Sequence, residues 1–301
     1  MLRRRQTHRT IPDHATRRID EASLGTYTVI AELARGGTST VYLGEQLATG
    51  ERIAIKALDT RFVDRSDMVQ RLLGEHELAR RVRHAGLLDI RHADQTIDGI
   101  PYLVMEYLDG ESLSALANRL TLPVGAIIAI AAQIASAIGA LHAAGIVHCD
   151  LKPDNVFVLY EPGLGGWPRI KVIDYGVARS IEDPVPSDGA IAGTPAFMAP
   201  EQWRGAPVLK SDVYALGCVL YELVTGEPLF SGALPQLMTA HCERLPERPA
   251  ARCPGLDPEL DRLIVRALAK DPAMRPTMAD LGHELTRLAP VAGTTCLDAT
   301  G

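Results

Sequence analysis

The chain has 301 residues, a formal net charge of −6, 47% hydrophobic residues and 23% charged residues. This composition is ordinary for a globular protein, and the acidic balance gives no reason to expect nucleic acid as the main partner. The five cysteines are odd in number and form no CxxC pair, so we expect reduced thiols and a cytoplasmic location. No membrane span is predicted, on the criterion of about 18 consecutive apolar residues.

The two ends differ in composition from the rest. Residues 1–26 contain six arginines without a hydrophobic period, which predicts a basic, flexible arm and not an anchor for membrane or nucleic acid. Thr7, Thr10 and Thr16 lie among those arginines and could accept phosphate. Residues 290–301 are predicted to form a flexible tail.

Residues 27–106 show strand patterns around one helix. A glycine turn at "RGG" joins "YTVIAELA" to "TVYLGEQL", and "ERIAIKAL" supplies a third strand. The stretch "SDMVQRLLGEHELARRVRH" has helical spacing, and two further strands lie in "LLDIRHAD" and "IPYLVMEYL". One helix on a strand-rich sheet predicts a small α+β lobe.

Residues 107–289 are mainly helical in pattern. "LPVGAIIAIAAQIASAIGALHAAG" is predicted to begin near Pro123 and to stop at Gly145. "SDVYALGCVLYELVTGE" is apolar almost all round, which is typical of a buried helix, with Ser211 as its N-cap and Gly226 at its C-terminus. A larger, mostly helical second lobe is therefore expected.

Candidate phosphate-binding groups lie in the first lobe. In "ELARGGTSTVYLG", Gly36 and Gly37 would let backbone N–H groups approach phosphate oxygens, although a plain hairpin turn has the same pattern. On the neighbouring strand, Ala54 and Lys56 share a face, which would place Ala54 against a flat base and Lys56 toward phosphates. A buried lysine needs an opposite charge, and Glu75 of the helix is the expected partner.

A second group of polar residues lies in "IVHCDLKPDNVFV", framed by apolar residues on both sides. Asn155 in this loop, and Asp174 at the end of the apolar strand in "KVIDYGVAR", supply hard oxygen ligands suited to Mg²⁺ carrying a nucleotide. Asp150 would then accept a hydroxyl proton, and Lys152 would steady the transferred phosphoryl group. This set of groups predicts phosphoryl transfer.

In this order the motifs resemble those of the protein kinase family, specifically the eukaryotic-type (Hanks-type) serine/threonine kinases of bacteria, over about residues 27–288. The resemblance implies a bilobal α+β fold and the use of ATP with Mg²⁺ or Mn²⁺. It implies that Lys56 contacts the phosphates while Glu75 anchors it, and that Asp150 is the catalytic base beside Lys152. Asn155 and Asp174 would bind the metal ion.

The resemblance also implies a nucleotide pocket, in which Met105 is the gatekeeper and Glu106 and Leu108 offer backbone groups to adenine. The residues assigned to nucleotide binding are Leu33, Gly36, Gly37, Ser39, Val41, Ala54, Lys56, Met105, Glu106, Leu108, Asn155, Phe157 and Asp174. Asp109 could reach the ribose, and Glu111 could contact either the ribose or a basic residue of the substrate. Both could instead belong to a solvated loop.

Further motifs imply a platform for protein substrates. "GTPAFMAPEQ" resembles the end of an activation segment that runs from Asp174 to Glu201. Glu201 would pair with Arg275, Asp212 would cap the catalytic loop, and Thr194 would contact Asp150 and Lys152. The "DLKPxN" and "GT" patterns imply serine or threonine as the acceptor, in proteins that include the enzyme itself.

Several positions depart from the family pattern. Of the three glycines of G-x-G-x-x-G only Gly36 matches, since Ala34 and Ser39 occupy the outer positions, and Tyr175 replaces phenylalanine in the DFG motif. Cys149 replaces the arginine of HRD, which in the family pairs with a phosphate on the activation segment. A cysteine cannot form that ion pair. Activity is therefore predicted not to depend on phosphorylation of the activation segment.

The predicted activation segment has few hydroxyl groups, and the roles of two other residues stay open. Its stretch "RSIEDPVPSDGAIAGTPAF" offers only Ser180, Ser187 and Thr194 as hydroxyls. Cys149 is interpreted as a small buried filler, with a redox role as the alternative. Trp167, in a long connection over residues 160–169, could dock a partner or simply pack.

Two other functions compete with an active protein kinase. The missing glycines and Cys149 would suit a pseudokinase that acts as a scaffold, and a small-molecule phosphotransferase could share the fold. A P-loop enzyme is excluded because the sequence has no G-x-x-x-x-G-K-[ST]. Dimerisation through the small lobe stays open.

Overall fold

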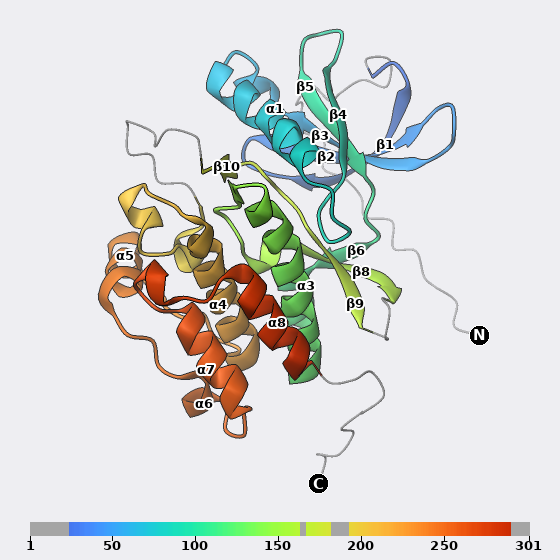
Figure 1. Ribbon diagram of the computed structural model, residues 1–301. Helices are drawn as coiled ribbons and strands as arrows, with labels where there is room; N and C mark the ends of the chain where they lie inside the picture. The colour runs from blue at the N-terminus through green and yellow to red at the C-terminus, as the bar shows by residue number, and fades with distance from the viewer. Residues whose placement is uncertain (1–23, 163–166, 182–192, 290–301) are drawn as a thin grey trace, which may run out of the picture.

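The computed structural model describes residues 24–162, 167–181 and 193–289. The predicted arm up to residue 23, the predicted tail from residue 290, and Ser187 lie outside these described residues. The described chain forms two lobes, of which the first is built on a sheet and the second on helices (Figure 1). The bilobal α+β architecture expected from the sequence is therefore confirmed.

The first lobe is a five-stranded antiparallel sheet with one helix. Its strands are β1 (Tyr27–Arg35), β2 (Ser39–Gln46), β3 (Arg52–Leu58), β4 (Ile90–Gln95) and β5 (Pro101–Glu106), and its helix is α1 (Ser66–Arg81). The strand order is β1-β2-β3-β5-β4, so β1 and β4 are the edges. Because side chains alternate along a strand, Ile53 and Ile55 enter one core cluster while Ala54 faces the other.

The start of this lobe lies slightly earlier than the boundary expected at residue 27. Leu24 is only 2% exposed and belongs to the same core cluster as Tyr27 and Ile53. The carbonyl of Thr26 also accepts a hydrogen bond from the N–H of Leu47. The sequence pattern missed these residues because three residues are too few to show a strand period.

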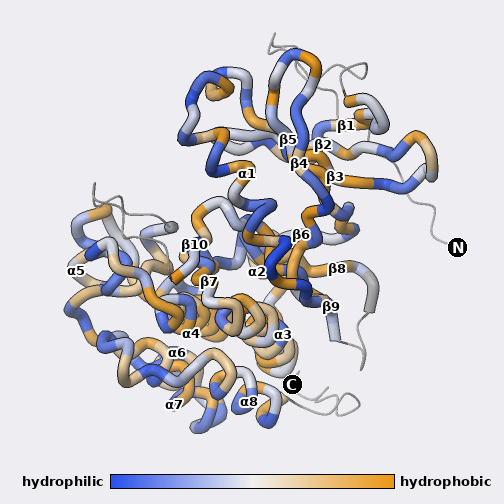
Figure 2. The backbone as a smooth tube through the Cα atoms, turned by 45° about the horizontal axis from the view of Figure 1, so that its top comes forward, coloured by the Kyte–Doolittle hydropathy of each residue, from blue (hydrophilic) through white to orange (hydrophobic). Residues whose placement is uncertain are grey.

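The second lobe is built from seven helices of the described chain. They are α2 (Leu113–Arg119), α3 (Val124–Ala143), α4 (Leu209–Thr225), α5 (Leu234–Glu243), α6 (Pro249–Arg252), α7 (Pro258–Ala267) and α8 (Met278–Leu288). Apolar residues dominate α3 and α4 in the middle of this lobe, and charged residues appear on the outer helices (Figure 2). The central position of α3 and α4 explains why their sequences are apolar nearly all round.

Helix α3 corrects one prediction. By length and composition it is the one described helix that could cross a membrane, so the expectation that no segment would qualify is wrong. Most of its apolar window is buried inside the protein, where the helix packs against α8, α4 and β9. Its apolar sequence is therefore that of a core helix.

The start of α4 corrects another prediction. Ser211 was expected to be the N-cap, but the helix begins at Leu209 with Val208 as its N-cap. The Ser211 hydroxyl accepts from the N–H of Val208 at 3.0 Å and donates to Glu201 at 2.6 Å. The predicted C-terminus is confirmed, since Gly226 has a φ of +75° and caps the helix.

Short strands and 3₁₀ turns complete the described chain. The strands are β6 (Gly110–Ser112), β7 (Ile146–Val147), β8 (Val156–Pro162), β9 (Pro168–Val172) and β10 (Arg179–Ser180). Single 3₁₀ turns cover Thr60–Phe62, Pro153–Asn155, Pro195–Phe197, Gln202–Arg204 and Pro272–Met274. The backbone of Val172 bonds to Gly86 at 2.8 Å and to Leu88 at 3.0 Å, so the chain before β4 is fastened directly to β9.

Candidate active site

Lys56 lies at the centre of an ion-pair network that joins three elements. Its ammonium bonds both carboxylate oxygens of Glu75 on α1, at 2.7 and 2.8 Å, and approaches Asp174 at 3.3 Å. Burial alone would lower the pKa of Lys56, but the two carboxylates reverse this and hold it above its ordinary value. The predicted pairing of Lys56 with Glu75 is confirmed. The raised pKa keeps Lys56 charged at neutral pH, whereas burial raises the pKa of Glu75 above its ordinary value against the opposing effect of Lys56.

Asp174 follows β9 in a strained turn. Its φ is +68°, which is unusual for a residue with a side chain, and its carboxylate accepts the N–H of Gly176 at 3.1 Å. A Cβ on Gly176 would lie 3.0 Å from the Asp174 carboxylate and 3.1 Å from that of Glu75, so a larger residue here would press on both acids. Burial opposes ionisation of Asp174, but Lys56 and the Gly176 N–H outweigh it and hold the pKa below its ordinary value.

Asp150 is fixed by three side chains. One carboxylate oxygen accepts from Lys152 at 2.9 Å and from the Asn155 amide at 3.1 Å, and the other accepts from the Thr194 hydroxyl at 2.6 Å. Lys152 also donates to Thr194 at 2.6 Å. The predicted contact of Thr194 with Asp150 and Lys152 is confirmed. It brings a hydroxyl of the activation segment onto the catalytic loop.

The backbone of this loop is held by Asp212 at the start of α4. Its two oxygens accept the N–H groups of His148 and Cys149 at 2.9 and 3.0 Å, and one also bonds the His142 ring at 2.8 Å. These bonds stabilise the φ of +66° at Cys149, so the predicted capping by Asp212 is confirmed. The carbonyl of Cys149 accepts from the amide of Gln202, a contact that sequence reasoning missed.

Asn155 and Asp174 fit the expected metal site in their chemistry. The amide nitrogen of Asn155 donates to the carbonyl and the carboxylate of Asp150, and this orientation leaves the amide oxygen as an acceptor. Asp174 is ionised, as its lowered pKa requires. No group of three or more His, Cys, Asp or Glu residues capable of holding a metal occurs in the described ranges. Two protein oxygens suit Mg²⁺, which keeps waters and takes its other ligands from phosphates.

Four of the expected nucleotide-binding residues form cross-strand pairs, and others lie in the glycine turn. Val41 lies opposite Lys56 in the β2–β3 register, and Ala54 lies opposite Met105 in the β3–β5 register. The Gly36 N–H bonds the Ser39 carbonyl at 2.8 Å, so this group is already used in the turn. Gly37 follows Gly36 in the same turn.

Three other expected pocket residues stand in different surroundings. Leu33 on the edge strand β1 is 46% exposed, Leu108 packs against the main core, and Phe157 lies half-buried in β8. Of the two acids with an open role, Glu111 forms an ion pair with Arg119, while Asp109 is exposed. A local sequence pattern can assign a residue to a face of a strand or to a loop, but it does not predict how exposed the side chain is.

Glu106 has a role that the sequence did not reveal. Its carboxylate accepts from the Lys171 ammonium at 2.6 Å and from the N–H of Asp89 at 2.8 Å. Lys171 also donates to the carbonyl of Leu87 at 3.1 Å. The segment between the lobes is thus clamped to β9 by an ion pair. No sequence signal marks this pair, because its members are 65 positions apart.

Tyr175 and Cys149 are both buried at the positions where the chain departs from the family pattern. Tyr175 is 2% exposed, and its hydroxyl lies 3.5 Å from the Leu88 carbonyl, so the ring packs as expected and the hydroxyl has one distant partner. Burial, with a smaller effect of Asp212, raises the pKa of the Cys149 thiol above its ordinary value. A buried protonated thiol is unreactive, which favours the filler interpretation over the redox one.

The end of the activation segment is anchored in the second lobe. Both Arg275 terminal nitrogens bond Glu201, at 2.6 and 2.9 Å, and the Arg275 side chain is fully buried. The predicted pair is confirmed, and the Ser211 hydroxyl is an additional partner of Glu201. This bidentate pair joins the segment to α4 and to the turn before α8.

Comparisons with known proteins agree with this geometry. A family model described as "Protein kinase domain" matches residues 27–285. Relatives include "Serine/threonine-protein kinase Pkn1" of Myxococcus xanthus, 39% identical over 83% of this chain and 36% of that protein. "Serine/threonine-protein kinase PknB" of Mycobacterium tuberculosis is 33% identical over 93% of this chain and 44% of that protein. The chain therefore spans less than half the length of these relatives.

Proposed function

The chain belongs to the protein kinase family, and from this premise we propose that it transfers the γ-phosphoryl group of ATP to serine or threonine hydroxyls of proteins, itself included. The observation that carries the proposal is the cluster around Asp150, where Lys152, Asn155 and Thr194 bond one carboxylate. The Lys56–Glu75–Asp174 network completes the set of charges that phosphoryl transfer needs.

The proposed division of labour follows from these contacts. Asp150 is held where it can accept the proton of an acceptor hydroxyl, and the adjacent Lys152 ammonium would stabilise charge on the transferred group. Lys56, held by Glu75, would bind ATP phosphates. Asn155 and Asp174 would hold Mg²⁺, with Mn²⁺ as the alternative, and the metal would neutralise charge on the phosphates.

The departures in the glycine turn bear on ATP affinity. Ser39 stands where the family has a glycine, and its carbonyl is bonded to the N–H of Gly36. The Gly37 N–H and the Ser39 hydroxyl would then serve the phosphates in place of the missing glycines. This supports altered ATP affinity with retained activity, since the sequence retains Lys56, Asp150, Asn155 and Asp174.

The presence of Cys149 supports a kinase activity that does not depend on phosphorylation of the activation segment. Two of the three hydroxyls in that segment are poor acceptors, because Ser180 is 4% exposed and Thr194 is bonded to Asp150 and Lys152. Replacing Ser187 by alanine is therefore expected to leave activity unchanged, because Cys149 cannot form an ion pair with a phosphate at that position. Loss of most activity in that variant would contradict this part of the proposal.

The test of function is phosphate transfer from γ-labelled ATP with Mg²⁺, with acceptor sites mapped by mass spectrometry. Asp150→Asn is expected to abolish labelling of serine and threonine, by at least about 100-fold for loss of a general base. Asp154→Asn, an exposed acid in the same loop, is the matched control and should retain labelling. Absence of labelling in the wild type with several protein substrates would favour the pseudokinase, and labelling of small molecules alone would favour a small-molecule phosphotransferase.

A further inference from the structure

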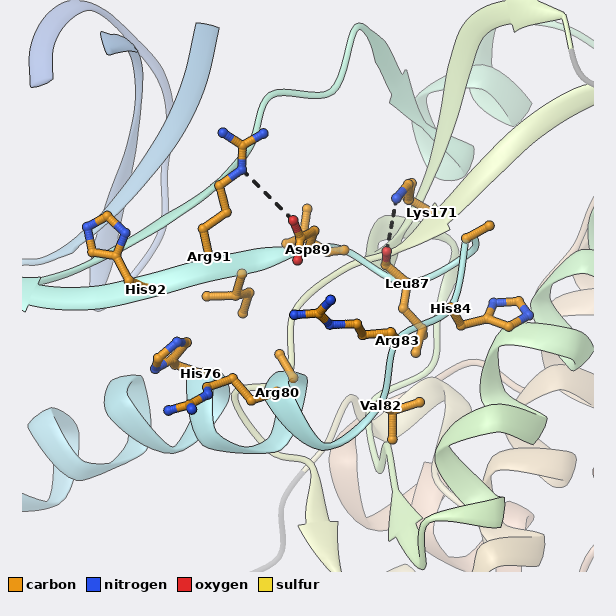
Figure 3. Close-up of a pocket in the computed structure, with 14 residues that line it drawn as sticks. His76, Arg80, Val82, Arg83, His84, Leu87, Asp89, Arg91, His92 and Lys171 are labelled. Carbon is orange, nitrogen blue, oxygen red and sulfur yellow. Dashed lines mark hydrogen bonds and ion pairs between the residues drawn. The ribbon is translucent and has the colours of Figure 1, made fainter. Parts of the chain in front are cut away.

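A basic cavity lies between helix α1 and strand β4, and none of the residues that line it is among those assigned to catalysis. It has a volume of about 990 Å³ and lies between the C-terminal half of α1 and strand β4, with Lys171 of β9 also lining it. We refer to it as the α1–β4 cavity (Figure 3). Four cationic side chains line it, Arg80, Arg83, Arg91 and Lys171, together with three histidines and a single acid, Asp89. Since the whole chain has a net charge of −6, so many cations in one cavity need an explanation.

Two of the cations are already neutralised by partners. Arg91 pairs with Glu51 at 2.6 Å and lies 3.9 Å from Asp89, and Lys171 pairs with Glu106 at 2.6 Å. These two residues therefore need no further anion. They leave Arg80 and Arg83, whose side chains are both exposed to solvent, as the cations that are available to bind a ligand in the cavity.

Arg83 has no counterion in the part of the chain that the structure describes, and Arg80 has only a loose one, Glu77 at 3.9 Å. The close-up places the Arg83 guanidinium between α1 and β4, and it shows Arg80 near the C-terminal end of α1 (Figure 3). Arg80 lies in the last turn of α1, where a cation also complements the helix dipole. Arg83 lies beyond the end of that helix, so this explanation does not cover it.

His76 supplies an independent observation at the same place. It is 9% exposed, it lines the cavity, and its Nε2 atom has no hydrogen-bond partner within the described residues. A buried polar nitrogen without a partner is costly, because it has lost its water. The histidine and the two arginines come from one helix and the residues just after it, so a single ligand could satisfy all three.

We propose that the α1–β4 cavity binds a phosphate-bearing ligand with at least two phosphate groups, held by Arg83 and Arg80 and hydrogen-bonded by His76. Guanidinium groups bind phosphate oxygens through paired N–H donors, which favours arginine over lysine at such sites. The volume exceeds that of one phosphate and lies at the upper end of ordinary small-ligand pockets. The cavity lining includes no Phe, Tyr or Trp, so its cations and histidines dominate the polar contacts that it offers.

The test is calorimetric titration of the full chain at constant ionic strength and constant free Mg²⁺. A saturating non-hydrolysable ATP analogue occupies the nucleotide site, so that added phosphates cannot bind there. The two phosphate probes are tripolyphosphate and a peptide that carries two phosphoserines. The same peptide with glutamates in place of the phosphoserines is the third probe. The tighter of the two phosphate probes identifies whether the source is a free phosphate chain or a phosphorylated polypeptide.

At least one phosphate probe is expected to bind, and Arg83→Gln is expected to weaken it at least about tenfold, the loss typical of a charge-assisted contact. Arg80→Gln should weaken it to a smaller degree. Arg81→Gln is the matched control, since Arg81 shares the helix end but donates to the Ala144 carbonyl and does not line the cavity. Unchanged melting temperatures would show that the variants are folded.

Three results would overturn the proposal. One is the absence of binding by both phosphate probes at low millimolar concentration. Another is binding that Arg83→Gln and Arg80→Gln leave unchanged, since the ligand would then sit elsewhere. The third is equal affinity for the glutamate peptide, which would refute the assignment of phosphate as the recognised group.

Discussion

Replacing Arg275 by methionine should be among the most destabilising substitutions of a polar residue in this protein. The guanidinium is fully buried and makes five hydrogen bonds. Two of these go to Glu201 and three to the backbone carbonyls of Ala269, Lys210 and Lys270. Methionine fills much of the volume but replaces none of these donors.

The magnitude follows from what the substitution leaves behind. Glu201 is 8% exposed, and after the change its carboxylate would keep only the Ser211 hydroxyl as a partner. Breaking a buried ion pair by removing one member costs about 3–5 kcal/mol, because the remaining charge is buried without compensation. That is a large part of the roughly 5–15 kcal/mol by which a typical domain is stable.

The assay is urea unfolding of wild type, Arg275→Met and the double variant Glu201→Met/Arg275→Met. The double variant removes the stranded carboxylate, so it should recover at least about 1 kcal/mol relative to Arg275→Met. Arg287→Gln is the matched control. Its ion pair with Glu259 lies on the surface, with the two side chains 61% and 46% exposed, and its loss should cost less than about 1 kcal/mol.

Two results would refute this reasoning. If Arg275→Met cost no more than Arg287→Gln, the buried pair would contribute little to stability. If the double variant were less stable than Arg275→Met, the penalty would come from lost packing and not from an unpaired carboxylate.

Four further predictions rest on single positions. Thr194→Ala should lower the turnover rate about ten- to a hundredfold, because it removes two charge-assisted hydrogen bonds. Thr194→Ser should keep the wild-type turnover rate. Equal turnover rates for Thr194→Ala and wild type in steady-state assays of phosphate transfer would contradict this. Gly193→Ala should destabilise the fold by about 1–3 kcal/mol in urea unfolding, because φ is +123° and a Cβ would lie 2.7 Å from the Cys149 carbonyl. Gly74→Ala, in the middle of α1 with open space around it, should stabilise by about 0.5–1 kcal/mol, and a loss of stability would show an unseen contact. Burial, with help from Lys270, lowers the pKa of His241 from 6.5 to about 4. As the pH falls from 6.5 to 4, the unfolded chain binds a proton before the folded chain does, so the free energy of unfolding should fall by about 3 kcal/mol. A His241→Gln variant should lack that slope in urea unfolding measured across this pH range.

Much of the fold was readable from local patterns. Alternation around the "RGG" turn identified the first hairpin, and the residues from Tyr27 onward gave the five strands of the sheet at nearly the observed bounds. Gly145 and Gly226 ended their helices as predicted, since a positive φ at a helix end favours glycine strongly. The loop with Asp150 was also found, because its polar residues stand out between two apolar strands.

Other features depend on which segments meet in space. The apolar pattern of α3 is the same for a core helix and a membrane span, and only its packing against α8, α4 and β9 distinguishes them. Ser211 has the residue type of an N-cap, but its hydroxyl is directed to the buried Glu201, and the N-cap is Val208, three residues earlier. In both cases the local pattern was compatible with two structures, and the packing of the segment decided between them.

The sequence by itself determined the chemistry available to this protein, because the residue types, their spacing and their order along the chain are local properties. Tertiary structure decided the contacts between distant residues, such as the Lys171–Glu106 clamp and the basic cavity formed where α1, β4 and β9 meet. These features depend on the three-dimensional packing of elements. Distances between side chains that lie tens of residues apart are set by that packing and leave no local pattern in one sequence.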